Sequence, residues 1–139
     1  EKILNKSGQL TEEEYIVMKS HTLIGASMLA RLDHYREEEL ARTAYQICRW
    51  HHERYDGGGY PDGLKGEEIP IAAQVVSIAD AYDALISPRV YKEGFSHEQA
   101  MQMIRNGECG AFNPLLIECL EDSQSRIRYL ASMTAERFS

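Results

Sequence analysis

Apolar residues recur at helical spacing along most of this 139-residue chain, and no segment shows the strict apolar–polar alternation of a half-buried strand. The first helical stretch opens with a capping box at residues 11–14 and predicts a helix to about Leu32, with Gly25 as the point where it would be interrupted. The next stretch predicts a helix over about 37–52. A period of 3.6 residues is typical of helices and not of strands, so the pattern predicts an all-α fold.

A glycine-rich segment, residues 55–66, separates these two helices from the rest of the chain, because five of its twelve residues are glycine. Beyond it, the pattern and the capping residues predict three more helices, over about 70–86, 96–104 and 113–130. The expected architecture is a helical bundle of about five helices in one domain, 1–139, with a C-terminal helical extension at 122–139.

Charge and composition narrow the classes of function. Asp and Glu number 22 against 15 Lys and Arg, for a net charge of −7, which disfavours DNA, RNA and anionic membranes as partners. No apolar run approaches the ~20 residues of a membrane span, and the first residues lack a signal-peptide pattern. The three cysteines are odd in number and lack a CxxC spacing, which is typical of reduced thiols. We therefore expect a cytoplasmic protein.

Two adjacent histidines, His51 and His52, end the second predicted helix just before the glycine-rich segment. Neighbouring residues on a helix point about 100° apart. From a regular helix, the pair therefore suits two ions, or one ion and a group that orients a ligand, better than it suits a single ion. The alternative is a pair of solvent-facing histidines at a polar helix end.

Other charged and titratable residues also stand out. Asp80 and Asp83 lie at the edge of the apolar stripe of the third predicted helix, where a carboxylate needs a metal, an ion pair or hydrogen bonds. His21 lies on the first helix, and a histidine there, taken alone, more often has a structural role than a ligand role. Arg89 and Lys92 follow the helix of Asp80, where they would either cap its last carbonyl groups or bind a phosphate.

In this order, the motifs resemble the HD-GYP family, bacterial phosphodiesterases of the HD superfamily that degrade cyclic di-GMP. Gly59-Tyr60-Pro61 matches the tripeptide in the family's name. The likeness runs from about Ile3 to Leu120. It is carried by Ile3-Leu4-Asn5-Lys6, Met18 to Gly25, His51 to Pro61, Leu64 to Pro70, Ile78 to Leu85, Arg89, Tyr91-Lys92 and Phe112-Asn113-Pro114.

The resemblance implies a bundle of helices with two or three divalent metal ions, usually iron, with manganese as the other metal known in the family. The positions that match the family's metal ligands are His21, His51, His52 and Asp80. Those that match its phosphate-binding residues are Arg89 and Lys92. The loop formed by Gly59, Tyr60 and Pro61 shapes the site in the family and serves contacts with partners.

One part of the family pattern is missing. The His-Asp dyad of the family lies in a segment resembling HDIGK, upstream of the stretch that matches Ile3 to Lys6, and no His-Asp dipeptide occurs anywhere in this sequence. We therefore expect an N-terminally truncated domain with no assigned catalytic residue, and the alternative is a naturally degenerate member of the family. Alone, it should bind metal weakly and show little or no turnover.

The function that the resemblance implies is a metal-dependent phosphodiesterase that hydrolyses cyclic di-GMP to pGpG or GMP. Its partners would be the cyclic dinucleotide and GGDEF-type, sensory or receiver domains of bacterial signalling. Divalent ions would add positive charge at the site, so the net charge of −7 does not argue against this anionic substrate. The alternative is a non-catalytic module for cyclic di-GMP or protein binding, which would need Arg89, Lys92 and the loop but not the dyad.

Overall fold

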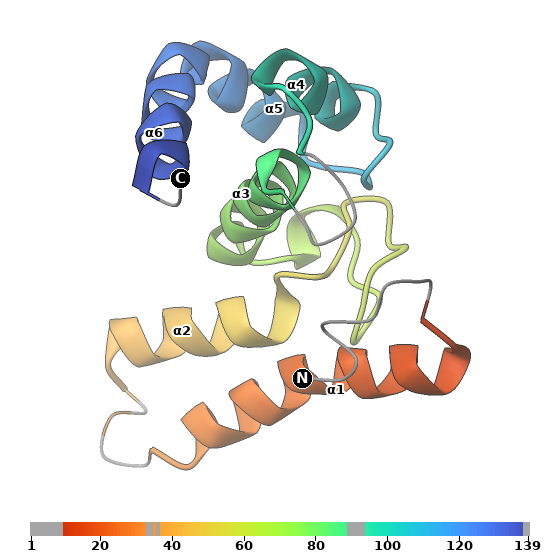
Figure 1. Ribbon diagram of the computed structural model, residues 1–139. Coiled ribbons are helices and arrows are strands. Elements are labelled where there is room, and N and C mark those ends of the chain that lie inside the picture. The colour runs from red at the N-terminus through yellow and green to blue at the C-terminus, as the bar shows by residue number, and fades with distance from the viewer. Residues whose placement is uncertain (1–9, 33–34, 36, 89–93, 138–139) are drawn as a thin grey trace.

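The computed structural model describes residues 10–32, 35, 37–88 and 94–137, and within these residues it contains helices and no strand (Figure 1). This confirms the prediction of an all-α bundle. The elements are α1 (Glu12–Ala30), α2 (Glu39–Trp50), the 3₁₀ turn η2 (Gly66–Glu68), α3 (Ile71–Ile86), α4 (His97–Arg105), α5 (Pro114–Asp122) and α6 (Gln124–Arg137).

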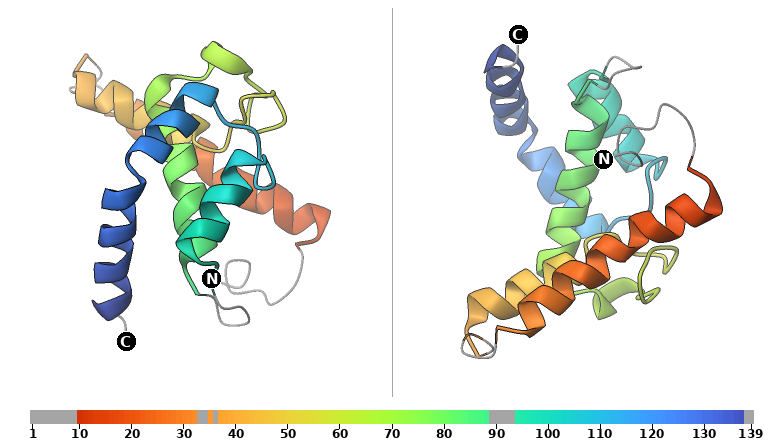
Figure 2. Two further views of the ribbon diagram at one scale, coloured as in Figure 1. Left: turned by 90° about the horizontal axis from the view of Figure 1, so that it is seen from above. Right: turned by 60° about the horizontal axis from the view of Figure 1, so that its bottom comes forward.

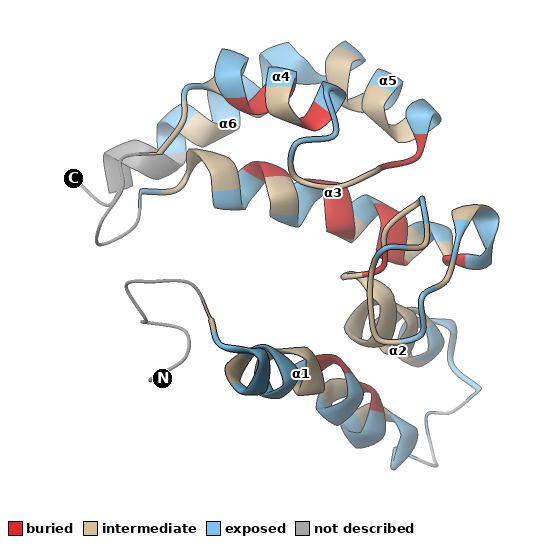
Figure 3. Ribbon diagram, turned by 90° about the vertical axis from the view of Figure 1, so that its right-hand side faces the viewer, coloured by how far each residue is buried: buried red, intermediate tan, exposed pale blue. Residues whose placement is uncertain are grey.

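Helices that follow one another in the sequence pack against one another. The α1–α2 hairpin lies on one side of α3, α4 and α5 lie on the other, and α6 stands at the edge of the molecule (Figures 1 and 2). The main core joins α3 to α4 and α5 and consists of Ile78, Tyr82, Ala100, Met101, Ile104 and Phe112. By contrast, α1 buries only Thr22 and Ala26, and most of its surface is exposed (Figure 3).

Side-chain caps fix the starts of three helices where the sequence predicts them. The hydroxyl of Thr11 accepts the N–H of Glu14, whose carboxylate accepts the N–H of Thr11, and this capping box opens α1. Ser96 opens α4 through the same kind of box. Asn113 accepts the N–H of Leu115 at the start of α5, where proline takes the first helical position.

Two details of the predicted helices are wrong. α1 continues through Gly25, where a side chain would begin 3.4 Å from the sulfur of Cys48, so the glycine serves close packing on α2 and no interruption. The helix predicted over about 113–130 divides at Ser123 into α5 and α6, giving six helices among the described residues instead of about five. The run 121–124 is polar, and Asp and Ser are weak helix formers, so the helix divides there.

Candidate metal centre

Three histidines converge where α1 lies against the end of α2. His21 comes from the middle of α1, His51 is the C-cap residue of α2, and His52 lies in the turn that follows. One ring nitrogen of each lies within 4.8 Å of the others, and the Nε2 atoms of His21 and His51 are 3.5 Å apart. Two metal–nitrogen bonds of about 2.1 Å at a tetrahedral angle hold their nitrogens about 3.4 Å apart. The cluster therefore fits a shared metal ion.

Backbone carbonyl groups fix the orientation of two of these rings. The Nδ1 atom of His51 lies 2.7 Å from the oxygen of Ile47, and that of His21 lies 2.5 Å from the oxygen of Met18. A carbonyl oxygen only accepts hydrogen bonds, so Nδ1 carries the proton in both rings and donates it. Each Nε2 keeps its lone pair, which is the arrangement that metal-binding histidines have.

His52 is held as a neutral ring. It stacks on Tyr60, with ring centroids 4.9 Å apart and 27° between the planes. Burial, together with the neighbouring rings of His51 and His21, lowers the pKa of His52 to about 4. At neutral pH the ring therefore has no proton to lose before it coordinates a metal.

His51 and His52 are predicted to reach two ions, or one ion and a group that orients a ligand, if they lie on a regular helix. In the structure α2 ends at Trp50, and His52 lies in the turn beyond it. Both rings consequently approach the ring of His21, 5.5 Å and 5.0 Å away between centroids.

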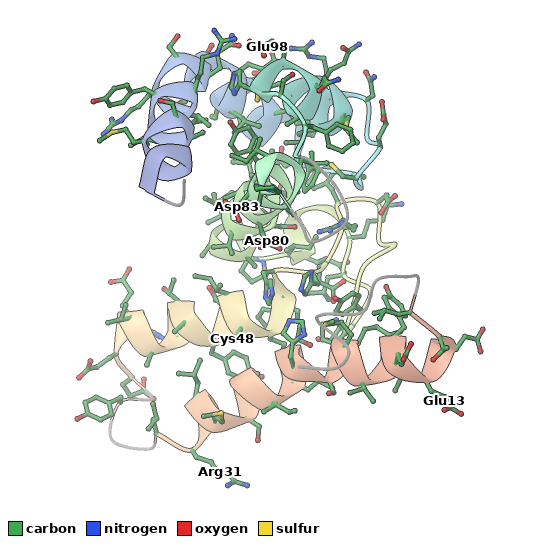
Figure 4. All side chains as sticks on the ribbon, viewed as in Figure 1. Glu13, Arg31, Cys48, Asp80, Asp83 and Glu98 are labelled. Carbon is green, nitrogen blue, oxygen red and sulfur yellow. The ribbon has the colours of Figure 1, made fainter. Side chains whose placement is uncertain are left out.

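Asp80 lies beside the histidines and outside their cluster. It is exposed on α3, with Asp83 further along the same helix (Figure 4). Its charge reaches His52, because it opposes the lowering of the pKa of that ring. The structure thus brings three of the four predicted ligands together and leaves Asp80 as their nearest carboxylate neighbour on α3. The predicted phosphate-binding residues, Arg89 and Lys92, lie outside the described residues.

The glycine-rich loop is anchored by Glu53, a residue that the sequence analysis does not single out. Its side chain is 2 % exposed. The carboxylate accepts the backbone N–H groups of Asp62, Gly63 and Leu64 at 2.7, 3.1 and 3.0 Å. The sequence carries no local signal for this role, because Glu53 lies four residues before the first glycine and its partners follow nine to eleven residues after it.

The loop in turn supports the histidines. A side chain at Gly59 would begin 2.4 Å from backbone atoms of Glu53 and Arg54, so only glycine allows the backbone at position 59 to approach that of these two residues so closely. Next in the chain, Tyr60 donates its N–H to the carbonyl of His52 at 3.2 Å and stacks its ring on the imidazole. Gly59 and Tyr60 thus hold the loop against Glu53, Arg54 and His52, and the role of Gly59-Tyr60-Pro61 in shaping the site stays a prediction.

The sequence matches the HD domain family over residues 1–113. The chain belongs to the HD domain family. Members of this family are metal-dependent, so the three histidines are the candidate metal centre of an HD domain.

Relatives of this HD domain confirm the resemblance to the HD-GYP type. The chain is 45 % identical to a cyclic di-GMP phosphodiesterase of Vibrio cholerae over 84 % of its length and 24 % of the relative. It is 40 % identical to a cyclic di-GMP phosphodiesterase of Thermotoga maritima, over 85 % of the chain and 31 % of the relative. A 3′3′-cGAMP-specific phosphodiesterase of Vibrio cholerae is 36 % identical over 85 % of the chain and 22 % of the relative. The chain thus spans about a quarter of the length of these relatives.

None of the helices in the described residues combines the length and the hydrophobicity that a membrane span requires.

Proposed function

We propose that this chain carries the metal-binding part of a phosphodiesterase centre that hydrolyses cyclic di-GMP. The observation that carries the proposal is the convergence of three imidazoles within 4.8 Å, two of them with Nε2 lone pairs left free by backbone hydrogen bonds. Relatives that are 40–45 % identical and are named cyclic di-GMP phosphodiesterases support the substrate.

In this proposal His21, His51 and His52 hold one divalent ion, and Asp80 contributes a carboxylate to that ion or to a second or third one. Histidine with carboxylate ligands favours iron or manganese over calcium or magnesium. When bound, such ions neutralise the charge of a phosphodiester and activate a water molecule for in-line attack.

The remaining residues of the chain position the ligands and the substrate. Glu53 and Tyr60 hold His52 in place through the loop and the stacked ring. We assign phosphate binding to Arg89 and Lys92, and pGpG or GMP as the product. Because the sequence contains no His-Asp dyad, no catalytic residue is assigned, and we expect weak metal binding and little turnover from the chain alone.

We further propose that the domain works in the cytoplasm, next to sensory, receiver or GGDEF-type domains. A cyclic di-GMP phosphodiesterase response regulator of Xanthomonas campestris, 38 % identical over 92 % of the chain, supports a signalling partner of this kind.

A hybrid enzyme tests the proposal. The segment of the Vibrio cholerae phosphodiesterase that matches this chain is replaced by the chain itself, and cyclic di-GMP and 3′3′-cGAMP hydrolysis are measured with manganese and with iron. We expect metal-dependent hydrolysis with preference for cyclic di-GMP, and its loss in His51→Ala. A folded, metal-loaded hybrid that hydrolyses neither dinucleotide would contradict the proposal. Tight cyclic di-GMP binding by the chain without any metal would instead indicate a non-catalytic binding module.

A further inference from the structure

A lysine and two tyrosines form a cluster on the loop side of the metal centre. The ammonium group of Lys19 lies 4.6 Å from the ring centroid of Tyr15 and 5.9 Å from that of Tyr60. The two tyrosine rings meet edge to face, with centroids 6.0 Å apart and 80° between the planes. Tyr60 also stacks on His52, so one ring contacts both the lysine cluster and a candidate metal ligand.

The ammonium group of Lys19 has no carboxylate partner among the described residues. A cation held beside a centre for divalent ions is repelled by those ions unless an anion lies between them. The position of Lys19 therefore indicates an anionic ligand that bridges the lysine and the metal centre.

We propose that Lys19 binds a phosphate group of the substrate, on the α1 side of the metal centre. This inference rests on the proposed function and adds a substrate-binding residue to it. A cyclic dinucleotide carries two phosphodiester groups. When one lies at the metal centre, Lys19 supplies a cation for the other from the helix that also carries His21, in addition to the phosphate contacts assigned to Arg89 and Lys92. A hydrogen bond from an ammonium group to a phosphate is charge-assisted. The ammonium group acts as a point charge, so the contact tolerates rotation of the phosphate.

The aromatic rings position the ammonium group. Lys19 and Tyr15 are four residues apart on α1, so they are neighbours on one face of the helix. A cation over an aromatic ring is attracted to it without being neutralised, and it keeps its donors free for an anion. Tyr15→Leu should therefore weaken substrate binding through Lys19, whereas Tyr15→Phe, which keeps the ring, should not.

The test measures metal and dinucleotide binding separately, by calorimetry on the complete chain. Manganese is titrated first, and cyclic di-GMP is then titrated into the manganese-loaded protein. The variants are Lys19→Gln and Lys19→Arg, with Arg31→Gln as the matched control. Arg31 is also a cation of α1, but it lies at the opposite end of the helix from Glu13 and points away from the molecule (Figure 4).

We expect Lys19→Gln to weaken cyclic di-GMP binding about tenfold, the usual loss for one charge-assisted contact. Lys19→Arg and Arg31→Gln should stay within about twofold of the parent chain, and manganese affinity should not fall in any of them. Unchanged dinucleotide binding in Lys19→Gln would overturn this inference and leave the proposed function standing. An equal loss of manganese and dinucleotide binding would also overturn it, because it would indicate a structural role. A parent chain that binds manganese but not cyclic di-GMP would overturn this inference, and hydrolysis by the hybrid enzyme would then decide the proposed function separately.

Discussion

Replacing Glu53 should release the glycine-rich loop. The carboxylate is 2 % exposed and accepts three backbone N–H groups. In Glu53→Ala all three lose a charged acceptor worth about 1.5–3 kcal/mol each. The released loop lets water reach part of these groups, and such losses are not additive. We therefore expect a loss near the low end of the sum, about 4–5 kcal/mol of unfolding free energy.

Glu53→Gln separates the contribution of the third bond. Its amide oxygen can retain the two bonds that Oε1 accepts from Asp62 and Gly63, while the amide nitrogen faces the N–H of Leu64. The lost hydrogen bond from Leu64, together with the two N–H donors that then face each other, should lower the free energy of unfolding by about 2 kcal/mol. Urea unfolding followed by circular dichroism resolves this as a midpoint shift of about 1 M. Glu118→Gln, a change at an exposed site on α5, should stay within about 0.5 kcal/mol of the parent.

Two results would refute this reasoning. A cost below about 1 kcal/mol for Glu53→Ala would mean that the three hydrogen bonds do not hold the loop. Equal costs for the Ala and Gln variants would mean that the two hydrogen bonds retained by the amide oxygen of Gln contribute nothing to stability. In either case the loop would have to owe its conformation to the packing of Tyr60 and Gly59.

Three further predictions concern the loop and the metal. Gly59→Ala should lower the free energy of unfolding by about 3 kcal/mol, and the melting temperature with it, because its Cβ would lie 2.4 Å from backbone atoms. In Gly58→Ala the Cβ would meet only a flexible carboxylate at 3.1 Å, so the loss of stability should be small. His21→Ala should weaken manganese binding at least about tenfold in calorimetry, whereas His97→Ala, on α4, should not. Removing metal with EDTA should lower the melting temperature by about 5 °C, and this difference should vanish in His51→Ala.

The features that the sequence predicts correctly depend on neighbouring residues. Helix starts at Thr11, Ser96 and Asn113 follow from side chains that cap N–H groups two or three positions away. The end of the helical pattern at the glycine-rich segment, residues 55–66, also follows from the residues of that segment alone. His21 differs, since it meets His51 across thirty residues, and only the resemblance to a known family placed the two in one site.

The features that the sequence did not predict depend on tertiary contacts. The N–H groups that donate to Glu53 come together only once the loop is folded, so the sequence around Glu53 does not predict that its side chain is buried. The position of Lys19 beside the metal centre likewise could not be predicted, because it depends on the contact that Tyr60 of the loop makes with α1. The division at Ser123 is an exception, because it follows from the weak helix formers of the run 121–124 although no glycine or proline marks it.

The spacing of the metal ligands depends on residues that are not ligands. The pair His51 and His52 is fixed by the end of α2 and by the loop, but His21 is carried on α1, which buries only Thr22 and Ala26. At Gly25 the missing side chain lets α1 approach Cys48 of α2, one turn along from His21. A metal fixes the distance between two ligand nitrogens to within a few tenths of an ångström. A larger side chain at position 25 that separates α1 from α2 should therefore weaken metal binding as a ligand substitution does, because it moves the Nε2 of His21 away from that of His51.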